Sequence, residues 1–181
     1  PQGIMGPELM EKMKAQAIRF GAKFVALNVT SVDFTSRPFV LHTSDLEIKS
    51  RSVIIATGAE TKWLDVKGER ELIGRGISSC APCDAPFFKD KYVLVVGGGD
   101  SAMEEALVLT KFAKKVTIIH RRGEFKASKV MQEKVFANKN IDVLWNNEVT
   151  EVLGNQKFEA VKIKNNKSGE ELELKADGLF V

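Results

Sequence analysis

The chain has 181 residues, a hydrophobic content of 44% and a formal net charge of +3. This length allows one or two globular domains. The balance of 27 basic and 24 acidic residues argues against nucleic acid or a membrane surface as partner. No apolar run approaches the roughly 18 residues of a membrane helix, and the first residues lack a signal-peptide pattern. We therefore expect a cytoplasmic protein.

The first part of the chain is expected to form a helix followed by short strands. Pro7 and Glu8 favour a helix start, and Gly21 favours its end. Between them, apolar residues recur at three- and four-residue spacing, which predicts one apolar face. Alternating residues then predict a strand at residues 24–32, and residues 39–41 and 46–48 are expected to form a short antiparallel pair.

Residues 52–59 form a β-branched run that ends in small residues. Such a run predicts a core strand that is buried on both faces. The small residues at its end, among them Thr57 and Gly58, would also let a cofactor approach the backbone closely. The pattern alone favours the plain core strand, and cofactor contact stays as the alternative.

The rest of the chain predicts an α/β domain. Mixed charge and glycines mark residues 61–76 as a linker with a helical turn near residues 69–73, so the domain boundary is placed at Leu64. From residue 92 the predicted order is β-α-β-α-β, followed by an antiparallel β-meander. The predicted strands are residues 92–96, 116–119, 141–145, 148–153, 158–164 and 171–175, and the predicted helices are residues 101–112 and 126–138.

The segment G-G-G-D-S-A at residues 97–102 follows a predicted strand and opens a predicted helix. It has the form G-x-G-x-x-A, in which Gly97 would make the tight turn and Gly99 would let the backbone approach a pyrophosphate. Ala102 would let the helix pack closely on the sheet, and the helix N-terminus from Ser101 would present free N–H groups to the phosphates. This context favours a dinucleotide site over a structural glycine turn.

Basic side chains follow the next predicted strand. NAD sites usually carry Asp or Glu about 20 residues after the glycine turn, to hold the ribose 2′-hydroxyl. Here His120, Arg121 and Arg122 occupy that place, with Lys126 one turn further. Guanidinium groups hold a 2′-phosphate through charge-assisted hydrogen bonds. A solvated basic surface is the alternative, but the position in the β-α-β unit favours NADPH over NADH.

Cys80 and Cys83 form a C-x-x-C motif that is followed directly by Asp84. If a helix begins here, its N–H groups would stabilise a thiolate at Cys83, and Asp84 would act as general acid and base. A structural zinc site needs about four ligands, whereas the chain has no further cysteine and His42 and His120 are distant in sequence. A redox dithiol is therefore favoured over a zinc half-site and over an inert pair.

The order C-A-P-C-D, G-G-G-D-S-A and H-R-R closely resembles that of the low-molecular-weight thioredoxin reductases, over essentially the whole chain. The resemblance implies that electrons pass from NADPH through FAD and the dithiol to a protein disulfide. It implies a thioredoxin or thioredoxin-like partner, and a homodimer when the protein is intact. Residues 1–63 would be the middle segment of a partial FAD-binding domain. Residues 64–181 would be a Rossmann-like, three-layer NADPH-binding domain with a β-meander.

The resemblance also implies roles for individual residues. Cys83 would contact the flavin, Cys80 would attack the substrate disulfide, and Asp84 would transfer protons. Thr57 and Gly58 look like the strand end that lies near the flavin in this family. The nucleotide would be bound by Gly97, Gly98, Gly99, Asp100, Ser101, Ala102, Glu104, His120, Arg121, Arg122 and Lys126.

The chain also differs from the family pattern. Ala85 follows the dithiol segment where many members carry Gly, and Lys126 replaces the usual Arg, so it cannot bind a phosphate bidentately. Residues 177–181 look like the return into the FAD domain, and the family's domain rotation would place hinges near Leu64 and Val181. No first FAD fingerprint precedes residue 1, so we expect a fragment that neither holds FAD nor turns over alone.

Two alternatives to a thioredoxin reductase stay open. One is a non-catalytic NADP(H)-binding module in which the cysteines are incidental. The other is a different flavin-dependent dithiol reductase or oxidase on the same frame, such as a peroxiredoxin-reducing subunit.

Overall fold

The computed structural model describes residues 3–181, so the first two residues of the predicted 1–63 domain lie outside the described part. The chain forms two compact units, Pro1–Gly58 and Ala59–Val181. The division precedes Leu64, because Trp63 and Leu64 pack against the core of the second unit. Among residues 3–181, no helix combines the length and apolar character needed to span a bilayer.

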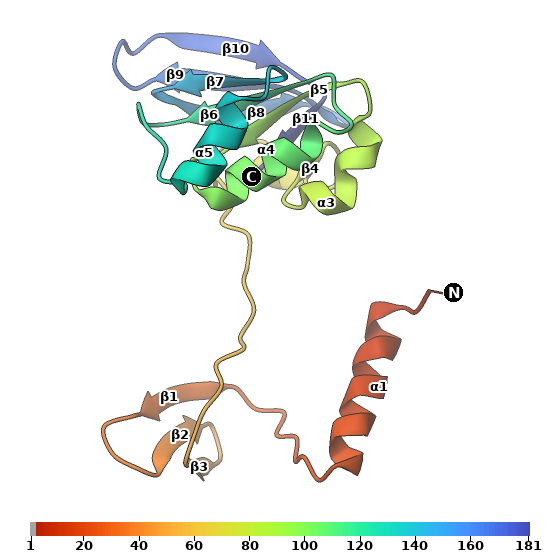
Figure 1. Ribbon diagram of the computed structural model, residues 1–181, viewed down its shortest axis with the longest axis vertical. Helices are drawn as coiled ribbons and strands as arrows, with labels where there is room; N and C mark the ends of the chain where they lie inside the picture. Colours follow the sequence, from red (N-terminus) through yellow and green to blue (C-terminus); the bar gives the residue numbers. More distant parts are fainter. Residues whose placement is uncertain (1–2) are drawn as a thin grey trace. The chain divides into compact units, whose positions relative to one another are not determined.

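The first unit contains one helix and one small antiparallel sheet. Helix α1 (Gly6–Arg19) has the predicted Pro7 in its first turn and is followed by Gly21 with a positive φ of 88°. The sheet has the order β1-β2-β3, formed by Val29–Asp33, Phe39–Thr43 and Glu47–Ser50 (Figure 1). The predicted helix and the predicted β2–β3 pair are therefore confirmed.

The strand predicted at residues 24–32 is confirmed only for residues 29–32, and the strand predicted at residues 52–59 is wrong. Residues 24–28 are irregular because strand β2 pairs only with residues from Val29 onward. Residues 52–59 form no strand, and Ile54 and Ile55 are 91% and 74% exposed. A strand buried on both faces needs hydrogen-bonded neighbours, and no strand within residues 3–181 pairs with this run. Its β-branched composition is not sufficient to make a strand without such neighbours.

A five-stranded parallel sheet of order β4-β11-β5-β6-β7 forms the centre of the second unit (Figure 1). The strands are Ile77–Ser78, Gly178–Phe180, Tyr92–Val96, Lys115–His120 and Ile141–Trp145. The predictions for β5, β6 and β7 are confirmed, whereas β4 and β11 were not predicted. Residues 177–181 were interpreted as the return into another domain, which is wrong for residues 178–180. These residues form a central strand, because both β4 and β5 pair with it.

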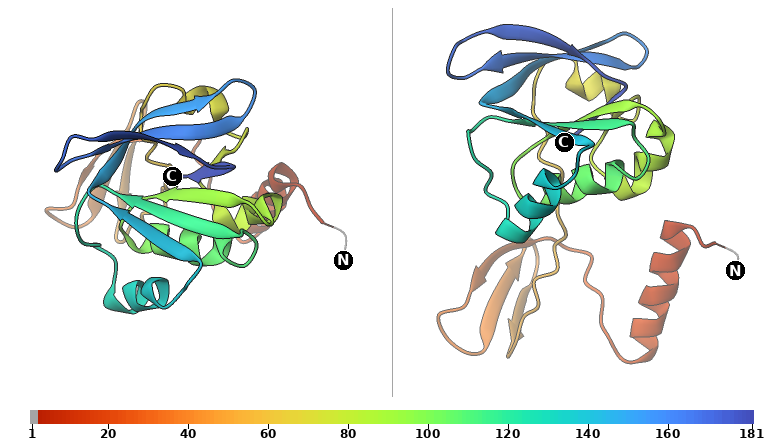
Figure 2. Two further views of the ribbon diagram at one scale, coloured as in Figure 1. Left: turned by 90° about the horizontal axis from the view of Figure 1, so that it is seen from above. Right: turned by 45° about the horizontal axis from the view of Figure 1, so that its top comes forward.

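The sheet is covered on both faces, which confirms the predicted three-layer α/β fold (Figures 1 and 2). Along β5, Val93 and Val95 belong to the core cluster shared with the helices, and Leu94 belongs to the cluster shared with the meander. This alternation is expected for a strand with two buried faces. The helices are α3 (Ala81–Asp84), α4 (Asp100–Leu109) and α5 (Lys129–Phe136), and the meander strands are β8 (Asn147–Gly154), β9 (Phe158–Asn165) and β10 (Glu171–Lys175).

A buried carboxylate holds the entry into the second unit. Glu69, the first residue of α2 (Glu69–Leu72), is 0% exposed. Its Oε1 accepts a hydrogen bond of 2.9 Å from the Leu64 N–H, and its Oε2 accepts one of 2.7 Å from the Asp65 N–H. Because two partly buried hydrogen bonds from the backbone depend on one buried side chain, Glu69 determines where the connecting segment joins the domain.

We expect Glu69→Ala to lower the free energy of unfolding by about 1–3 kcal/mol, since it removes the acceptor of two partly buried hydrogen bonds. Glu69→Gln keeps one acceptor oxygen and should recover part of this loss. Urea unfolding followed by the fluorescence of Trp63 and Trp145 measures the effect. Glu151→Ala, which removes a carboxylate paired with Lys67, is the control and should cost less. Equal midpoints for Glu69→Ala and the control would contradict this role.

Candidate nucleotide and dithiol site

The predicted functional residues of the second unit gather at one edge of the parallel sheet. Strand β5 runs directly into Gly97, β6 ends at His120, and β4 ends at Ser78, two residues before Cys80. Parallel strands present their carboxyl ends at a common edge. Strand order also changes direction at β5, because β6 and β7 follow on one side and β11 and β4 lie on the other. Ligand-binding crevices form at such switch points.

Packing explains the first two glycines of the turn. Gly97 has a φ of 154°, and a Cβ added to it would lie 2.6 Å from the Cβ of Ala102. A Cβ added to Gly98 would overlap the imidazole ring of His120. Gly99 differs from both, since nothing lies within 4 Å of a Cβ added there. The open side of the turn is therefore at Gly99, where a phosphate group can approach the backbone.

His120 supports the glycine turn from inside the domain. The residue is only 8% exposed, and its Nε2 lies 2.9 Å from the carbonyl oxygen of Glu124. A carbonyl only accepts, so Nε2 carries the proton and donates this hydrogen bond. Burial lowers the pKa of His120, and the positive charges of Arg122 and Arg121 lower it further. The imidazole is therefore neutral at pH 7 and holds the loop after β6 against Gly98.

The loop after β6 is bound to the glycine turn through the backbone. The carbonyl of Gly98 accepts hydrogen bonds from the N–H groups of Lys126 and Ala127, at 2.8 and 3.1 Å. The hydroxyl and N–H of Ser128 donate to Oδ1 of Asp100, at 2.7 and 3.0 Å. The hydrogen bond from this hydroxyl is the main cause that lowers the pKa of Asp100. The basic loop and the first turn of α4 are therefore one connected structure.

A pocket of ≈ 480 Å³ lies over this structure. Of the predicted nucleotide-binding residues, it is lined by Gly97, Gly98, Gly99, His120, Arg121, Arg122 and Lys126. The other residues that line the pocket were not predicted to bind the nucleotide, and they are Lys62, Trp63, Leu64, Val96, Ile119, Asn147, Glu148, Val149 and Val181. Its volume is within the range of about 300–1,000 Å³ for ligand pockets. Cationic side chains beside an open glycine backbone and apolar walls fit a phosphorylated dinucleotide.

The remaining predicted residues lie outside this pocket. Ser101 and Glu104 are exposed on α4, and Ala102 is buried against Gly97. Thr57 and Gly58 belong to the first unit and are exposed. Their assignment to cofactor binding stays a prediction.

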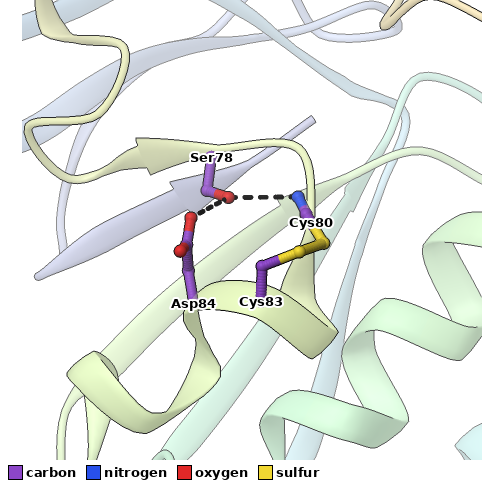
Figure 3. Close-up of a disulfide and its surroundings, with 4 residues drawn as sticks. All are labelled: Ser78, Cys80, Cys83 and Asp84. Carbon is purple, nitrogen blue, oxygen red and sulfur yellow. Dashed lines mark hydrogen bonds between the residues drawn. A yellow bond between two sulfur atoms is a disulfide. The ribbon is translucent and has the colours of Figure 1, made fainter. Parts of the chain in front are cut away.

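The dithiol lies at the start of α3. Cys80 and Cys83 form a disulfide with a Cα–Cα distance of 5.3 Å (Figure 3). The N–H groups of Cys83 and Asp84 both donate to the carbonyl oxygen of Cys80, at 3.1 Å. Cys83 is exposed and Cys80 is half-buried, so the two sulfurs belong to residues with different access to solvent. The helix start anticipated at this motif is present.

Ser78 connects the two ends of the dithiol segment. Its hydroxyl donates a hydrogen bond of 2.6 Å to Oδ2 of Asp84 and accepts one of 3.0 Å from the N–H of Cys80 (Figure 3). Ser78 was not predicted as a site residue, because a serine two positions before a C-x-x-C motif has no recognised spacing. Among residues 3–181, no group of three or more His, Cys, Asp or Glu side chains is placed to hold a metal ion.

Comparisons with known proteins agree with this geometry. The model of the pyridine nucleotide-disulphide oxidoreductase family matches residues 6–181. The thioredoxin reductase of Streptomyces coelicolor is 48% identical over 180 residues, which cover 99% of this chain and 56% of the relative. The NADPH-dependent thioredoxin reductase 3 of Arabidopsis thaliana is 47% identical over 184 residues, or 99% of this chain and 35% of that protein.

A solved structure shows a related arrangement. The thioredoxin reductase from Giardia duodenalis superposes with a TM-score of 0.81 at 42% identity, and the match covers 98% of this chain and 58% of that one. The chain therefore spans about half the length of most of the relatives it matches.

We expect Gly98→Ala and Gly99→Ala to separate folding from nucleotide binding. The methyl group of Gly98→Ala would overlap His120, so this variant should lose about 1–3 kcal/mol of stability, as in other overpacked sites. Gly99→Ala should keep its stability, because its methyl group meets open space.

The same methyl group narrows the open side of the turn, so Gly99→Ala should bind added NADPH at least about tenfold more weakly. Urea unfolding and the fluorescence of bound NADPH measure the two effects on the 181-residue chain. Full binding by Gly99→Ala would show that the phosphates lie elsewhere.

Proposed function

Because the chain belongs to the pyridine nucleotide-disulphide oxidoreductase family, we propose that it is the NADPH-binding, dithiol-bearing part of a thioredoxin reductase. One observation carries the proposal. The Cys80–Cys83 disulfide and the glycine turn with its basic loop lie at the same edge of one parallel sheet. One domain would therefore carry both the binding site for the reductant, NADPH, and the disulfide that is to be reduced.

The pocket over the glycine turn is the proposed NADPH site. The backbone at Gly99 and the N-terminus of α4 would hold the pyrophosphate, because both are open to it. Arg121, Arg122 and Lys126 line the same pocket and would hold the 2′-phosphate. The name of the Arabidopsis relative, which includes NADPH, supports this choice of nucleotide.

The dithiol is the proposed catalytic centre. FAD, the second cofactor of this family, would supply the electron pair taken from NADPH, next to the Thr57–Gly58 segment. Reduction breaks the Cys80–Cys83 bond and leaves two sulfurs that can carry protons. Cys80 would attack the disulfide of a thioredoxin, Cys83 would then close the bond again, and Asp84 would hold and return a proton. We also propose that the intact protein is a cytoplasmic homodimer.

The full-length protein that contains this chain provides the test. We expect a bound flavin whose absorbance bleaches with NADPH under anaerobic conditions, and thioredoxin disulfide that is reduced in turn. Cys80→Ser should keep the bleaching and lose at least about 10³-fold in thioredoxin reduction, since a nucleophile is removed. A protein without flavin that only binds NADPH would support the non-catalytic module instead. A flavin protein that reduces another disulfide but not thioredoxin would support the second alternative.

Nucleotide choice can be tested separately. Removing one charge-assisted contact to a phosphate costs about 1.5–3 kcal/mol, so Arg121→Ala and Arg122→Ala should each raise the Kd for NADPH about 10- to 100-fold. The Kd for NADH should stay within about threefold, because NADH lacks the 2′-phosphate. Lys126→Arg is the matched gain-of-function control and should tighten NADPH binding. Equal losses for both nucleotides would contradict the assignment of these arginines.

A further inference from the structure

Ser78 lies at the centre of the dithiol segment and has no role in the scheme described so far. It is the last residue of β4 and is 8% exposed. Its hydroxyl lies 2.6 Å from Oδ2 of Asp84 and 3.0 Å from the N of Cys80. Figure 3 shows the hydroxyl between the carboxylate and the backbone N–H at the start of the disulfide loop. One small side chain thus contacts both the proposed proton carrier and the proposed nucleophile's backbone.

A hydroxyl is suited to this position because it has one proton to donate and two lone pairs to accept with. When Asp84 is ionised, the proton of Ser78 goes to the carboxylate and one lone pair receives the Cys80 N–H. When Asp84 carries a proton, that proton can be donated to the second lone pair of Ser78. The heavy atoms can therefore keep the same places in both protonation states of Asp84, and only the hydroxyl hydrogen of Ser78 has to turn.

We propose that Ser78 is a positioning residue for proton transfer at the dithiol, which rests on the thioredoxin reductase function proposed above. It holds the carboxyl group of Asp84 at a fixed place relative to Cys80 while the disulfide opens and closes. It acts through Asp84 and does not itself exchange a proton with the substrate.

Ser78 assists the proton transfers that accompany the opening and closing of the Cys80–Cys83 disulfide. Reduction breaks the Cys80–Cys83 bond with two electrons that originate from NADPH, and protons from solvent restore the thiol and the Asp84 carboxyl. In the return step the Cys80 thiolate attacks the substrate disulfide, so one Cys80–substrate bond forms and the substrate bond breaks. The departing substrate sulfur takes the proton held by Asp84. The Cys83 thiol then gives its proton to the Asp84 carboxylate, and its sulfur attacks Cys80. The bond between Cys80 and the substrate breaks, and the second substrate sulfur leaves with that proton.

A purely structural role for Ser78 gives a different expectation. A serine that accepts a hydrogen bond from the N–H two residues later can simply stabilise a local turn. Its removal would then lower stability and slow every step of the reaction alike. Kinetic separation of the steps, together with a double-mutant cycle, distinguishes the two roles.

The test uses the full-length enzyme with bound flavin, studied by anaerobic rapid mixing. Bleaching of the flavin by NADPH precedes the dithiol step, so Ser78→Ala should leave its rate within about twofold. Thioredoxin reduction by Ser78→Ala should fall about 10- to 100-fold, a part of the 10²–10⁴ that general acid–base catalysis contributes. Ser78→Thr keeps the hydroxyl and should recover most of the rate. Ser79→Ala, at the adjacent half-buried serine, is the matched control and should behave as wild type.

The double-mutant cycle shows whether Ser78 acts through Asp84. In an Asp84→Asn background, adding Ser78→Ala should slow thioredoxin reduction by less than about twofold, because the carboxyl group is already gone. Independent, multiplicative losses would overturn the proposal, and so would an equal slowing of flavin bleaching in Ser78→Ala. A wild-type rate in Ser78→Ala overturns this inference alone. A wild-type protein that cannot reduce thioredoxin with NADPH overturns the proposed function as well.

Discussion

The second unit depends on the common direction of the strands in its five-stranded sheet. Because β4 and β5 are both parallel to β11, and β6 is parallel to β5, the carboxyl ends of β4, β5 and β6 face the same edge. The dithiol follows β4, the glycine turn follows β5, and the basic loop follows β6. An antiparallel sheet of the same strands would place alternate segments on opposite edges. The direction of the strands, more than any single side chain, therefore places the disulfide and the nucleotide pocket at the same edge of the sheet.

Close packing then sets the shape of the nucleotide pocket. Gly98 has no side chain, so the His120 ring can lie beneath the turn, and the carbonyl of Gly98 receives the loop that carries Lys126. The neutral imidazole in turn holds the carbonyl of Glu124. The absence of a side chain at Gly98 is what lets a buried histidine pack against this turn. The dithiol segment has its own connection through Ser78, so the two halves of the site are organised separately.

Local signals allowed much of the second unit to be predicted from sequence. Strand β5 and helix α4 are marked by a β-branched run, a glycine turn and helical spacing. Strands β4 and β11 were missed, because two or three residues show no period and become a strand only by pairing. The run at residues 52–59 has the composition of a strand but, within residues 3–181, no neighbouring strand to pair with, so its composition led to a wrong prediction. The pocket walls at residues 62–64 and 147–149 and the hydroxyl of Ser78 come from tertiary contacts, which leave no pattern in the chain.

The position of β11 also determines the order in which the molecule can be assembled on a ribosome. Leu179 pairs with Ile77 on one side and with Leu94 on the other, so β4 has no place in the sheet until residues 178–180 have been made. At a synthesis rate of about 5–20 residues per second, the time between the synthesis of β4 and that of β11 is roughly 5–20 s. The nucleotide-binding core can form around β5, β6 and β7 in that time. Helix α3 can already pack on α4 in this interval, since Ala81 and Ala85 belong to the core on the helix side of the sheet. Strand β4, with Ser78 at its end, therefore gains its strand neighbour last, after β5, β6 and β7 have paired.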